Sequence, residues 1–258
     1  MDLLFSKYQG TGNDFIMVNN LDGRYNDLSI EQVQQLCDRR FGIGADGLIL
    51  LSAKKGYDFE MDYFNADGSK SFCGNGARCS VAFAQEVGIV KDKYHFLGID
   101  GEHEATVSNE NFAIKMRDCE LPEKVGEDYY LYTGSPHYMI FDSDLSYQNT
   151  FLKGKTIRYS DTYKAEGVNV NLIQQIESGK IAISTYERGV EDETLSCGTG
   201  ATACALLIAS LTDENLNEVA VKVKGGQLYI RFEKNGNGFK NVWLVGPAQK
   251  VFGGTSTI

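Results

Sequence analysis

Two cysteines of this chain stand in the same short pattern, Cys-Gly-x-Gly-Ala. The first copy begins at Cys73 and the second at Cys197, 124 positions later (197 minus 73). Each copy leads into an apolar, alanine-rich stretch, which is typical of a buried helix. The repeat therefore indicates a chain of two related halves, each carrying one such cysteine.

The position of these cysteines predicts reactive thiols. A cysteine at a helix N-terminus lies beside unpaired backbone N–H groups and the positive end of the helix dipole. Both features lower the pKa of a thiol and make thiolate available near neutral pH. The glycines that follow, Gly74 and Gly198, leave backbone amides open to an anionic ligand. The alternative is a pair of buried packing residues, the usual environment of free cysteine, but the duplication favours a chemical role.

A strand and a polar turn are expected to position each cysteine. Residues 62–68 precede Cys73, and residues 185–189 precede Cys197. Helices are expected over residues 74–87, with Gly88 as the C-cap, and over residues 198–211. Cys79 and Cys204 lie within these helices and are expected to pack in the core. Each half should therefore contain strands wrapped around one central helix.

The remaining stretches read mostly as strands. One more helix is expected to begin after Ser29, which forms a capping box with Gln32, and to end at Gly42. Strands are expected at residues 3–8, 15–18, 47–51, 59–64, 104–107, 112–116, 129–132, 138–141, 219–223, 228–232 and 242–245. Pro122 and Pro247 mark the division of the chain. We expect one domain over residues 1–120, to which residues 247–258 return, and a second over residues 121–246.

Composition excludes several classes of protein. A chain of 258 residues can form one or two domains with sizeable cores. The net charge of −10 and the absence of a Lys/Arg-rich run argue against nucleic acid or membrane as the main partner. No apolar run reaches the roughly 18 residues of a membrane span, and the first residues lack a signal-peptide pattern. We therefore expect a cytoplasmic protein with reduced thiols.

The cysteines and histidines do not form a metal-binding pattern. The six cysteines include no Cys-x-x-Cys pair and the three histidines no His-x-x-x-His pair, so no metal site is expected. Residues 198–203 match the dinucleotide fingerprint Gly-x-Gly-x-x-Ala. However, no apolar strand precedes them and no acidic residue follows at the required place, so nucleotide binding is not expected.

Several polar side chains suit a small zwitterionic acid. Arg188, just before Cys197, can bind a carboxylate through two hydrogen bonds. Side-chain amides can donate to carboxylates and accept from ammonium groups; the candidates are Asn13, Asn65, Asn75 and Asn169. Taken singly, each Asn could equally be a turn residue.

Taken together, the motifs resemble those of the diaminopimelate epimerase family. They span nearly the whole chain in the family's order: residues 10–15 (Gly-Thr-Gly-Asn-Asp-Phe), 40–47 (Arg-Phe-Gly-Ile-Gly-Ala-Asp-Gly), 64–68 (Phe-Asn-Ala-Asp-Gly), 73–78 (Cys-Gly-Asn-Gly-Ala-Arg), 136–137 (Pro-His), 167–169 (Gly-Val-Asn), 187–189 (Glu-Arg-Gly) and 197–201 (Cys-Gly-Thr-Gly-Ala). Two positions depart from it: Ser135 stands where many members have Asn, and Gly47 where many have Gln.

The resemblance implies a fold, an activity and a set of site residues. The fold is α/β (α+β), with two pseudo-symmetric domains, each a curved, mostly antiparallel sheet around a central helix. The activity is interconversion of LL- and meso-2,6-diaminopimelate in lysine and peptidoglycan-precursor biosynthesis, by a homodimer without pyridoxal phosphate, metal or redox cofactor. Cys73 and Cys197 match the catalytic acid/base pair, and His137 and Glu187 match residues that tune the thiols. The positions that match substrate-binding residues are Asn13, Asn65, Gly74, Asn75, Asn169, Glu187, Arg188, Gly198 and Thr199.

Two cysteines meet the needs of an epimerase. Inversion of a carbon requires a base on one face and an acid on the other, while helix N-termini can stabilise charge that grows on the α-carboxylate. Another isomerase on the same scaffold is an alternative, although proline racemases usually carry His at the position of Asn75 and phenazine-pathway isomerases lack the cysteine pair. A cysteine acyl-transferase that uses His137 as its base and a non-catalytic binding module are further alternatives. Neither explains a second activated cysteine.

Overall fold

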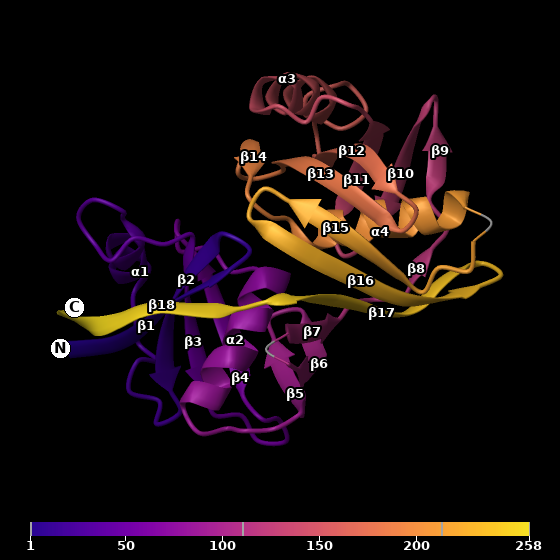
Figure 1. The fold of residues 1–258 in the computed structure, drawn as a ribbon. Coiled ribbons are helices and arrows are strands. Elements are labelled where there is room, and N and C mark those ends of the chain that lie inside the picture. The colour runs from indigo at the N-terminus through magenta and orange to yellow at the C-terminus, as the bar shows by residue number, and fades with distance from the viewer. Residues whose placement is uncertain (1, 110, 213, 258) are drawn as a thin grey trace. The chain divides into compact units, whose positions relative to one another are not determined.

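The computed structural model describes residues 2–109, 111–212 and 214–257. The chain divides into two compact units: unit 1, Met1–Ile114 with Gly246–Ile258, and unit 2, Lys115–Val245. Each unit is built mainly of strands that surround one helix (Figure 1).

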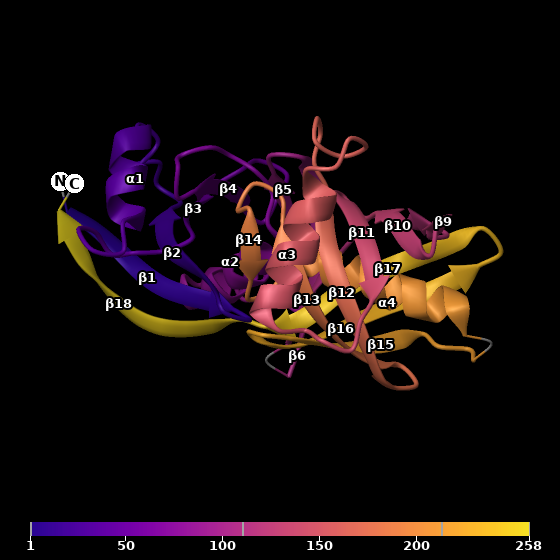
Figure 2. The same cartoon turned by 90° about the horizontal axis from the view of Figure 1, so that it is seen from above.

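Unit 1 contains two helices and eight strands among the described residues. The helices are α1 (Ile30–Cys37) and α2 (Gly74–Glu86). The strands are β1 (Asp2–Gly10), β2 (Asn13–Asn20), β3 (Gly47–Ser52), β4 (Glu60–Asn65), β5 (Lys93–Gly98), β6 (Gly101–Ser108), β7 (Asn111–Lys115) and β18 (Gln249–Thr257). Strand β18 pairs antiparallel with β1, from Asp2 opposite Thr257, so the two ends of the chain lie side by side (Figures 1 and 2).

Unit 2 has the same kinds of element in its described part. Its helices are α3 (Tyr147–Arg158) and α4 (Gly198–Leu211). Its strands are β8 (Cys119–Glu120), β9 (Glu123–Val125), β10 (Asp128–Tyr132), β11 (Pro136–Phe141), β12 (Asn169–Glu177), β13 (Lys180–Glu187), β14 (Asp192–Thr194), β15 (Glu218–Val223), β16 (Gly226–Asn235) and β17 (Gly238–Pro247).

The two units share one order of strand pairing. In unit 1, β1–β2, β3–β4, β5–β6 and β6–β7 pair antiparallel, whereas β2–β3 and β4–β5 pair parallel. In unit 2, β10–β11, β12–β13, β15–β16 and β16–β17 pair antiparallel, whereas β11–β12 and β13–β15 pair parallel. This correspondence confirms the predicted fold of two pseudo-symmetric, mostly antiparallel sheets, each around a central helix.

The central strands of unit 1 are buried on both faces. On one face, alternate residues such as Ile16 and Leu48 pack with Val33 of α1. On the other face, their neighbours Phe15 and Ile49 pack in the cluster that contains α2. A strand covered on both faces reads as a continuous apolar run, which is why β2 and β3 are so hydrophobic. The central helix is thereby fixed against the inner face of the sheet.

The corresponding outer helix of unit 2, α3, was not expected from the sequence. It packs on β12 and β13, and Phe151 contacts Tyr186 with ring centroids 5.8 Å apart. Only Thr150 and Gly154 of this helix are buried, so it lacks a clear apolar stripe. The sequence feature that marks the start of α3 is its N-cap. The Ser146 hydroxyl accepts a hydrogen bond from the backbone N–H of Asn149.

Helix α1 is shorter than expected. The capping box of Ser29 and Gln32 is present, but the helix ends at Cys37 and not at Gly42. Asp38 leaves the helical conformation, and its carboxylate accepts from the backbone N–H groups of Arg40 and Phe41 at 2.7 Å each. An aspartate that bonds the following backbone in this way favours a turn over further helix. Helix α2 is followed by Gly88 as expected, although the C-cap is Val87 and Gly88 is the next residue, with a φ of 95°.

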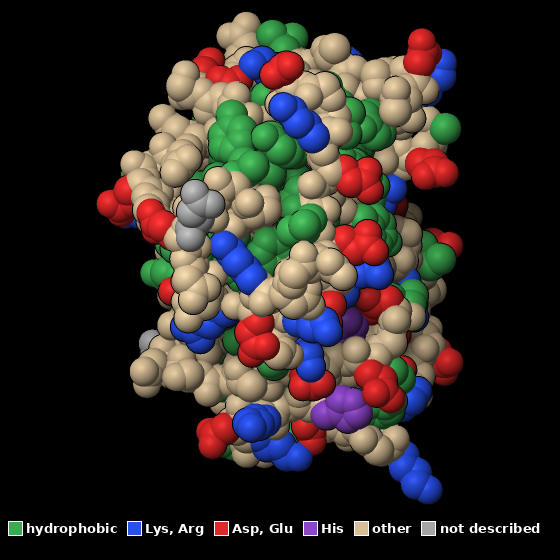
Figure 3. Space-filling model, turned by 90° about the vertical axis from the view of Figure 1, so that its right-hand side faces the viewer, with side chains coloured by type: hydrophobic (Ala, Val, Ile, Leu, Met, Phe, Trp, Pro, Cys, Tyr) green, Lys and Arg blue, Asp and Glu red, His purple; other side chains and the backbone are tan. Residues whose placement is uncertain are grey.

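The surface mixes charges of both signs. On the face shown in Figure 3, Lys and Arg side chains are interspersed with Asp and Glu side chains, and hydrophobic side chains gather in the upper part of the view. No helix of the described residues is long and apolar enough to cross a membrane.

Candidate active site

A tight turn positions the first predicted polar residue of unit 1. Strands β1 and β2 are joined at Thr11 and Gly12, which have φ values of 51° and 88°. Two consecutive positive φ angles are typical of a type I′ hairpin turn. Such an angle is uncommon for a β-branched residue such as Thr11. The turn sets Asn13 at the first position of β2, paired with Gly10.

Asn13, Cys73 and Asn75 form one cluster in unit 1. Cys73 is the N-cap of α2, and its side chain does not cap the helix. Its thiol Sγ donates to Asn13 Oδ1 at 3.5 Å, and Asn75 Nδ2 donates to the same oxygen at 3.2 Å. The first backbone bond of the helix runs from Ala77 N to Cys73 O, so the amides of residues 74–76 are its N-terminal donors. The structure thus brings three of the predicted site residues together in unit 1.

Asp46 fixes the orientation of the Asn13 side chain. Asn13 Nδ2 donates to Asp46 Oδ2 at 2.6 Å, which turns Oδ1 toward Cys73.

Asp14 receives hydrogen bonds from Lys7 and from both terminal nitrogens of Arg39. Burial alone would raise the pKa of Asp14, but the hydrogen bonds and charges of Arg39 and Lys7 outweigh it and lower that pKa to about 2. The carboxylate is therefore ionised at neutral pH.

Asn65 lies at the end of β4 and has different neighbours. Its Nδ2 donates to Ser69 O at 3.1 Å, to Ser69 Oγ at 3.0 Å and to Ser71 Oγ at 3.2 Å. These bonds close the turn that leads from β4 to Cys73. Its predicted contact with substrate stays a prediction.

Cys197 holds the equivalent place in unit 2. It is the N-cap of α4, again without a side-chain cap, and is buried. Its Sγ lies 3.5 Å from Thr199 Oγ1, and Thr199 Oγ1 lies 2.9 Å from His137 Nε2. Gly200 makes this approach possible, because a Cβ there would lie 3.3 Å from Cys197 Sγ and 2.5 Å from Asn171 Oδ1. His137 and Cys197 are thus connected through Thr199.

The hydrogen bonds of Asn171 settle which nitrogen of His137 carries the proton. Asn171 Nδ2 donates to the Tyr138 carbonyl at 3.1 Å, which identifies it as the nitrogen of the amide. The same nitrogen lies 3.1 Å from His137 Nδ1, which must therefore accept. Burial, together with the positive charge of Arg188, lowers the pKa of His137 to about 3. His137 is therefore neutral, with its proton on Nε2, facing Thr199 and Ser135.

Asn169 connects this network to Arg188. Asn169 Nδ2 donates to Ser135 Oγ at 2.9 Å and to the Pro136 carbonyl at 3.0 Å. Its Oδ1 accepts from the backbone N–H of Arg188 at 2.9 Å. The exposed Arg188 side chain donates to the Glu166 carbonyl at 2.9 Å. Glu187, the last residue of β13, accepts from Thr194 Oγ1 at 2.8 Å.

The clusters around Cys73 and Cys197 correspond position by position. Adding 124 to Asn13 gives His137, and adding 124 to Asn75 gives Thr199. The hydrogen bond between Asn13 and Asn75 at 3.2 Å thus has its counterpart between His137 and Thr199 at 2.9 Å. In each unit a hairpin residue and a residue of the first helical turn meet beside the N-cap cysteine. The repeat seen in the sequence is therefore a repeat of the site as well.

Comparisons with known proteins agree on one family. A family model for diaminopimelate epimerase matches residues 5–119 and 129–251. A diaminopimelate epimerase of Flavobacterium psychrophilum is 48% identical over 249 residues, which cover 95% of this chain and 97% of that protein. The chain belongs to the diaminopimelate epimerase family. A diaminopimelate epimerase of Chlorobaculum tepidum is 39% identical over 262 residues, 96% of this chain and 99% of that protein.

Solved structures show that the diaminopimelate epimerase fold is shared more widely. A PhzF-family phenazine biosynthesis protein of Bacillus anthracis has a TM-score of 0.76 at 13% identity, covering 100% of both chains. A hydroxyproline epimerase of Agrobacterium vitis, solved with bound trans-4-hydroxy-L-proline, has a TM-score of 0.69 at 13% identity, covering 99% of this chain and 91% of that one. At such identities the likeness concerns the fold alone.

Some polar residues that contact the predicted site residues were not recognised from the sequence. Ser135 was noted only as a departure from the family pattern, yet its hydroxyl contacts His137, Thr199 and Asn169. Asp46 and Asn171 orient Asn13 and His137. Asp46 lies inside the motif at residues 40–47 and Asn171 follows the motif at residues 167–169 by two positions, and the repeat distance of 124 could have paired Asn13 with His137 beforehand.

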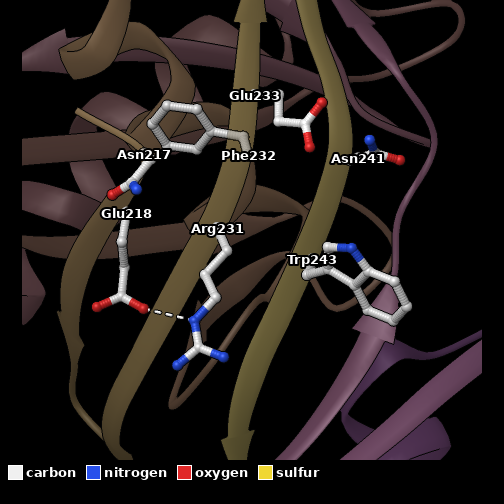
Figure 4. Close-up of a pocket in the computed structure, with 7 residues that line it drawn as sticks. All are labelled: Asn217, Glu218, Arg231, Phe232, Glu233, Asn241 and Trp243. Carbon is white, nitrogen blue, oxygen red and sulfur yellow. Dashed lines mark hydrogen bonds and ion pairs between the residues drawn. The ribbon is translucent and has the colours of Figure 1, made fainter. Parts of the chain in front are cut away.

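Unit 2 also contains a pocket that is separate from these residues. It has a volume of about 430 Å³ and is lined by Asn217, Glu218, Arg231, Phe232, Glu233, Asn241 and Trp243 (Figure 4). Arg231 and Glu218 form an ion pair at 2.6 Å on its wall. The lining contains no residue of the predicted site.

Proposed function

We propose that the protein is a diaminopimelate epimerase that interconverts LL- and meso-2,6-diaminopimelate. Cys73 and Cys197 form its acid/base pair, each acting on one face of the same α-carbon. The observation that carries this proposal is the duplicated setting of the two thiols. Each is the N-cap of a buried central helix. Cys73 contacts Asn13 and Cys197 contacts Thr199. These two residues belong to the pairs that correspond between the units, Asn13 with Asn75 and His137 with Thr199.

In this mechanism one cysteine, as thiolate, removes the α-proton while the other, as thiol, delivers a proton to the opposite face. The thiols must therefore be in opposite protonation states in each cycle, so their titration belongs to the pair. The donors at the start of α2 and α4 would bind the α-carboxylate, on which charge grows as the proton leaves. Gly74, Asn75, Gly198 and Thr199 are the residues at these two helix starts.

The remaining predicted residues have binding and tuning roles in the proposal. Arg188 would bind a substrate carboxylate, and Asn13, Asn65 and Asn169 would bind polar groups of the substrate. His137 and Glu187 would tune the thiol of Cys197. By the same resemblance we propose a homodimer that works in the cytoplasm, in lysine and peptidoglycan-precursor biosynthesis.

The state of His137 argues against a cysteine acyl-transferase. Such an enzyme needs a histidine that takes the proton of the cysteine near neutral pH. Burial holds the pKa of His137 at about 3, and its hydrogen bonds run to Thr199, Ser135 and Asn171. A histidine with that pKa is a weak base. The epimerase proposal needs it only as a neutral hydrogen-bonding group.

A substrate panel tests the proposed function. The purified protein, kept in reductant, is incubated with LL-diaminopimelate, L-proline or an acyl thioester without added cofactor, and the products are separated by chiral chromatography. We expect meso-diaminopimelate from the first substrate and no turnover of the other two. The Cys73→Ala/Cys197→Ala double variant, purified in parallel, controls for contaminating host enzymes. Turnover of proline or thioester with diaminopimelate left unchanged would contradict the proposal.

A further inference from the structure

A row of polar side chains leads from the sheet of unit 2 to the sulfur of Cys197. Its members are Thr185 of β13, Asn171 of β12, His137 of β11 and Thr199 of α4. The first three are at most 3% exposed. Buried polar groups need hydrogen-bond partners, so the direction of each bond follows from the donors and acceptors along the row. These directions decide whether the sulfur faces a donor or an acceptor.

Asn171 has both ends of its side-chain amide fixed. The Thr185 hydroxyl donates to Asn171 Oδ1 at 2.9 Å, while Nδ2 donates to the Tyr138 carbonyl at 3.1 Å. The opposite orientation would set the amide oxygen against that carbonyl, which can only accept. Gly200 leaves room for the amide, because a Cβ there would lie 2.5 Å from Oδ1. The amide nitrogen therefore stays 3.1 Å from His137 Nδ1 and keeps the imidazole proton on Nε2.

The direction of the hydroxyl proton of Thr199 follows from this tautomer. Thr199 Oγ1 lies 2.9 Å from His137 Nε2 and accepts a hydrogen bond from it. Among the described residues, the neighbours of Ser135 Oγ are His137 Nε2 at 3.0 Å, Asn169 Nδ2 at 2.9 Å and Thr199 Oγ1 at 3.2 Å. Both nitrogens are donors, so of these three neighbours Thr199 Oγ1 is the acceptor for the Ser135 hydroxyl. The proton of Thr199 is then left for the Cys197 sulfur, 3.5 Å away.

Ionisable groups also surround this row. Burial, and after it the positive charge of Arg188, lowers the pKa of His137 to about 3. Burial, and after it the charge of Cys197, raises the pKa of Cys204 well above its usual value, so Cys204 remains a thiol. Glu187 ends the strand that carries Thr185. All of these groups are retained in the variants described below, so a change in the acidity of Cys197 reports the hydrogen bonds.

We propose that Asn171 is a positioning residue for Cys197. By keeping the proton of His137 on Nε2, it turns the hydroxyl proton of Thr199 toward the sulfur. A hydroxyl that donates to the sulfur stabilises the thiolate, the form in which a cysteine can remove a proton. The role of Cys197 as a base rests on the proposed function, whereas the direction of the hydrogen bonds does not.

Nitrogen NMR tests the first step, the tautomer of His137, without any substrate. The chain has three histidines, so labelling with ¹⁵N-histidine gives a small set of imidazole signals, and that of His137 is the one absent from His137→Gln. In the wild-type protein we expect a neutral imidazole at neutral pH, with its proton on Nε2. Asn171→Leu removes the donor to Nδ1, so the form with its proton on Nδ1 should become detectable.

Site-resolved alkylation tests the second step, the contact with Cys197. The rate of its reaction with iodoacetamide is measured at a series of pH values by peptide mass spectrometry and normalised to its own plateau, so that differences in accessibility cancel. Thr199→Val removes the donor and should raise the midpoint by about one pH unit, a roughly tenfold slower reaction below the midpoint. Asn171→Leu should raise the midpoint by no more than that. Thr202→Val is the matched control: its hydroxyl donates to the Gly198 carbonyl at 2.9 Å within α4, so the midpoint should not move.

The conservative variant Thr199→Ser keeps the hydroxyl and should keep the wild-type midpoint of Cys197. A folded Asn171→Leu variant with the wild-type tautomer and the wild-type midpoint would overturn the inference. If that variant does not fold, a wild-type His137 with its proton on Nδ1, or an unshifted midpoint in Thr199→Val, overturns it equally. Failure to turn over diaminopimelate while both measurements give the expected result would instead count against the proposed function.

Discussion

Cys73→Ala and Cys197→Ala are each expected to lower epimerisation on the order of 10³-fold, as is usual when an acid/base group is lost. Each cysteine is the N-cap thiol of its own unit, and neither unit provides a second one at that position. Removing either thiol leaves one face of the α-carbon without its acid or base. The initial rate from LL-diaminopimelate, followed by chiral chromatography, measures the loss.

The packed cysteines of the same two helices provide matched controls. Cys79 and Cys204 are fully buried, and burial raises the pKa of both thiols. Cys79→Ala and Cys204→Ala should retain activity and lose about 1 kcal/mol of unfolding free energy. An active Cys73→Ala or Cys197→Ala variant would remove that cysteine from the catalytic pair.

Arg188→Lys is expected to lower kcat/KM about 10²-fold, the effect of losing one strong hydrogen bond to a charged group. The backbone of Arg188 is held by Asn169, and one guanidinium nitrogen is held by the Glu166 carbonyl. These contacts orient the exposed guanidinium group of Arg188 toward solvent. Lysine keeps the charge but cannot bind a carboxylate through two parallel hydrogen bonds. Steady-state kinetics with LL-diaminopimelate measure the change.

A neighbouring arginine controls for local disturbance. Arg158 forms an ion pair with Glu191 at 3.1 Å, and a Cβ on Gly167 would lie close to both Arg158 and Arg188. Arg158→Lys makes the same chemical change in the same region and should leave kcat/KM within a few-fold of wild type. Wild-type kinetics for Arg188→Lys would show that Arg188 has a structural role only.

The elements that carry the cysteines could be predicted because their signals are local. The apolar runs after Cys73 and Cys197 predict α2 and α4, and both helices begin at the expected glycine. Helix α3 could not be predicted from periodicity, since its stability depends on contacts such as that of Phe151 with Tyr186. The end of α1 depends on the carboxylate of Asp38, which competes with the helix for backbone N–H groups.

Within the candidate site, residue types could be predicted better than their partners. The motifs identify Asn13, Asn75 and His137, and the structure places each beside the N-terminus of the central helix of its own unit. The hydrogen bond from Arg78 to Thr11 could not be predicted, because it joins residues far apart in the chain through a strained turn. The role of Ser135 likewise depends on a three-way contact that only folding brings about.

The most direct test of the paired roles of Cys73 and Cys197 is the position of deuterium after a short reaction in heavy water. A proton removed by one thiol and replaced by the other cannot return to the inverted carbon. The proposal therefore predicts that nearly every early product molecule carries deuterium at that carbon, while recovered substrate is largely unlabelled. Early product that retains its original protium would show that a single base serves both faces, and would contradict the two-cysteine mechanism.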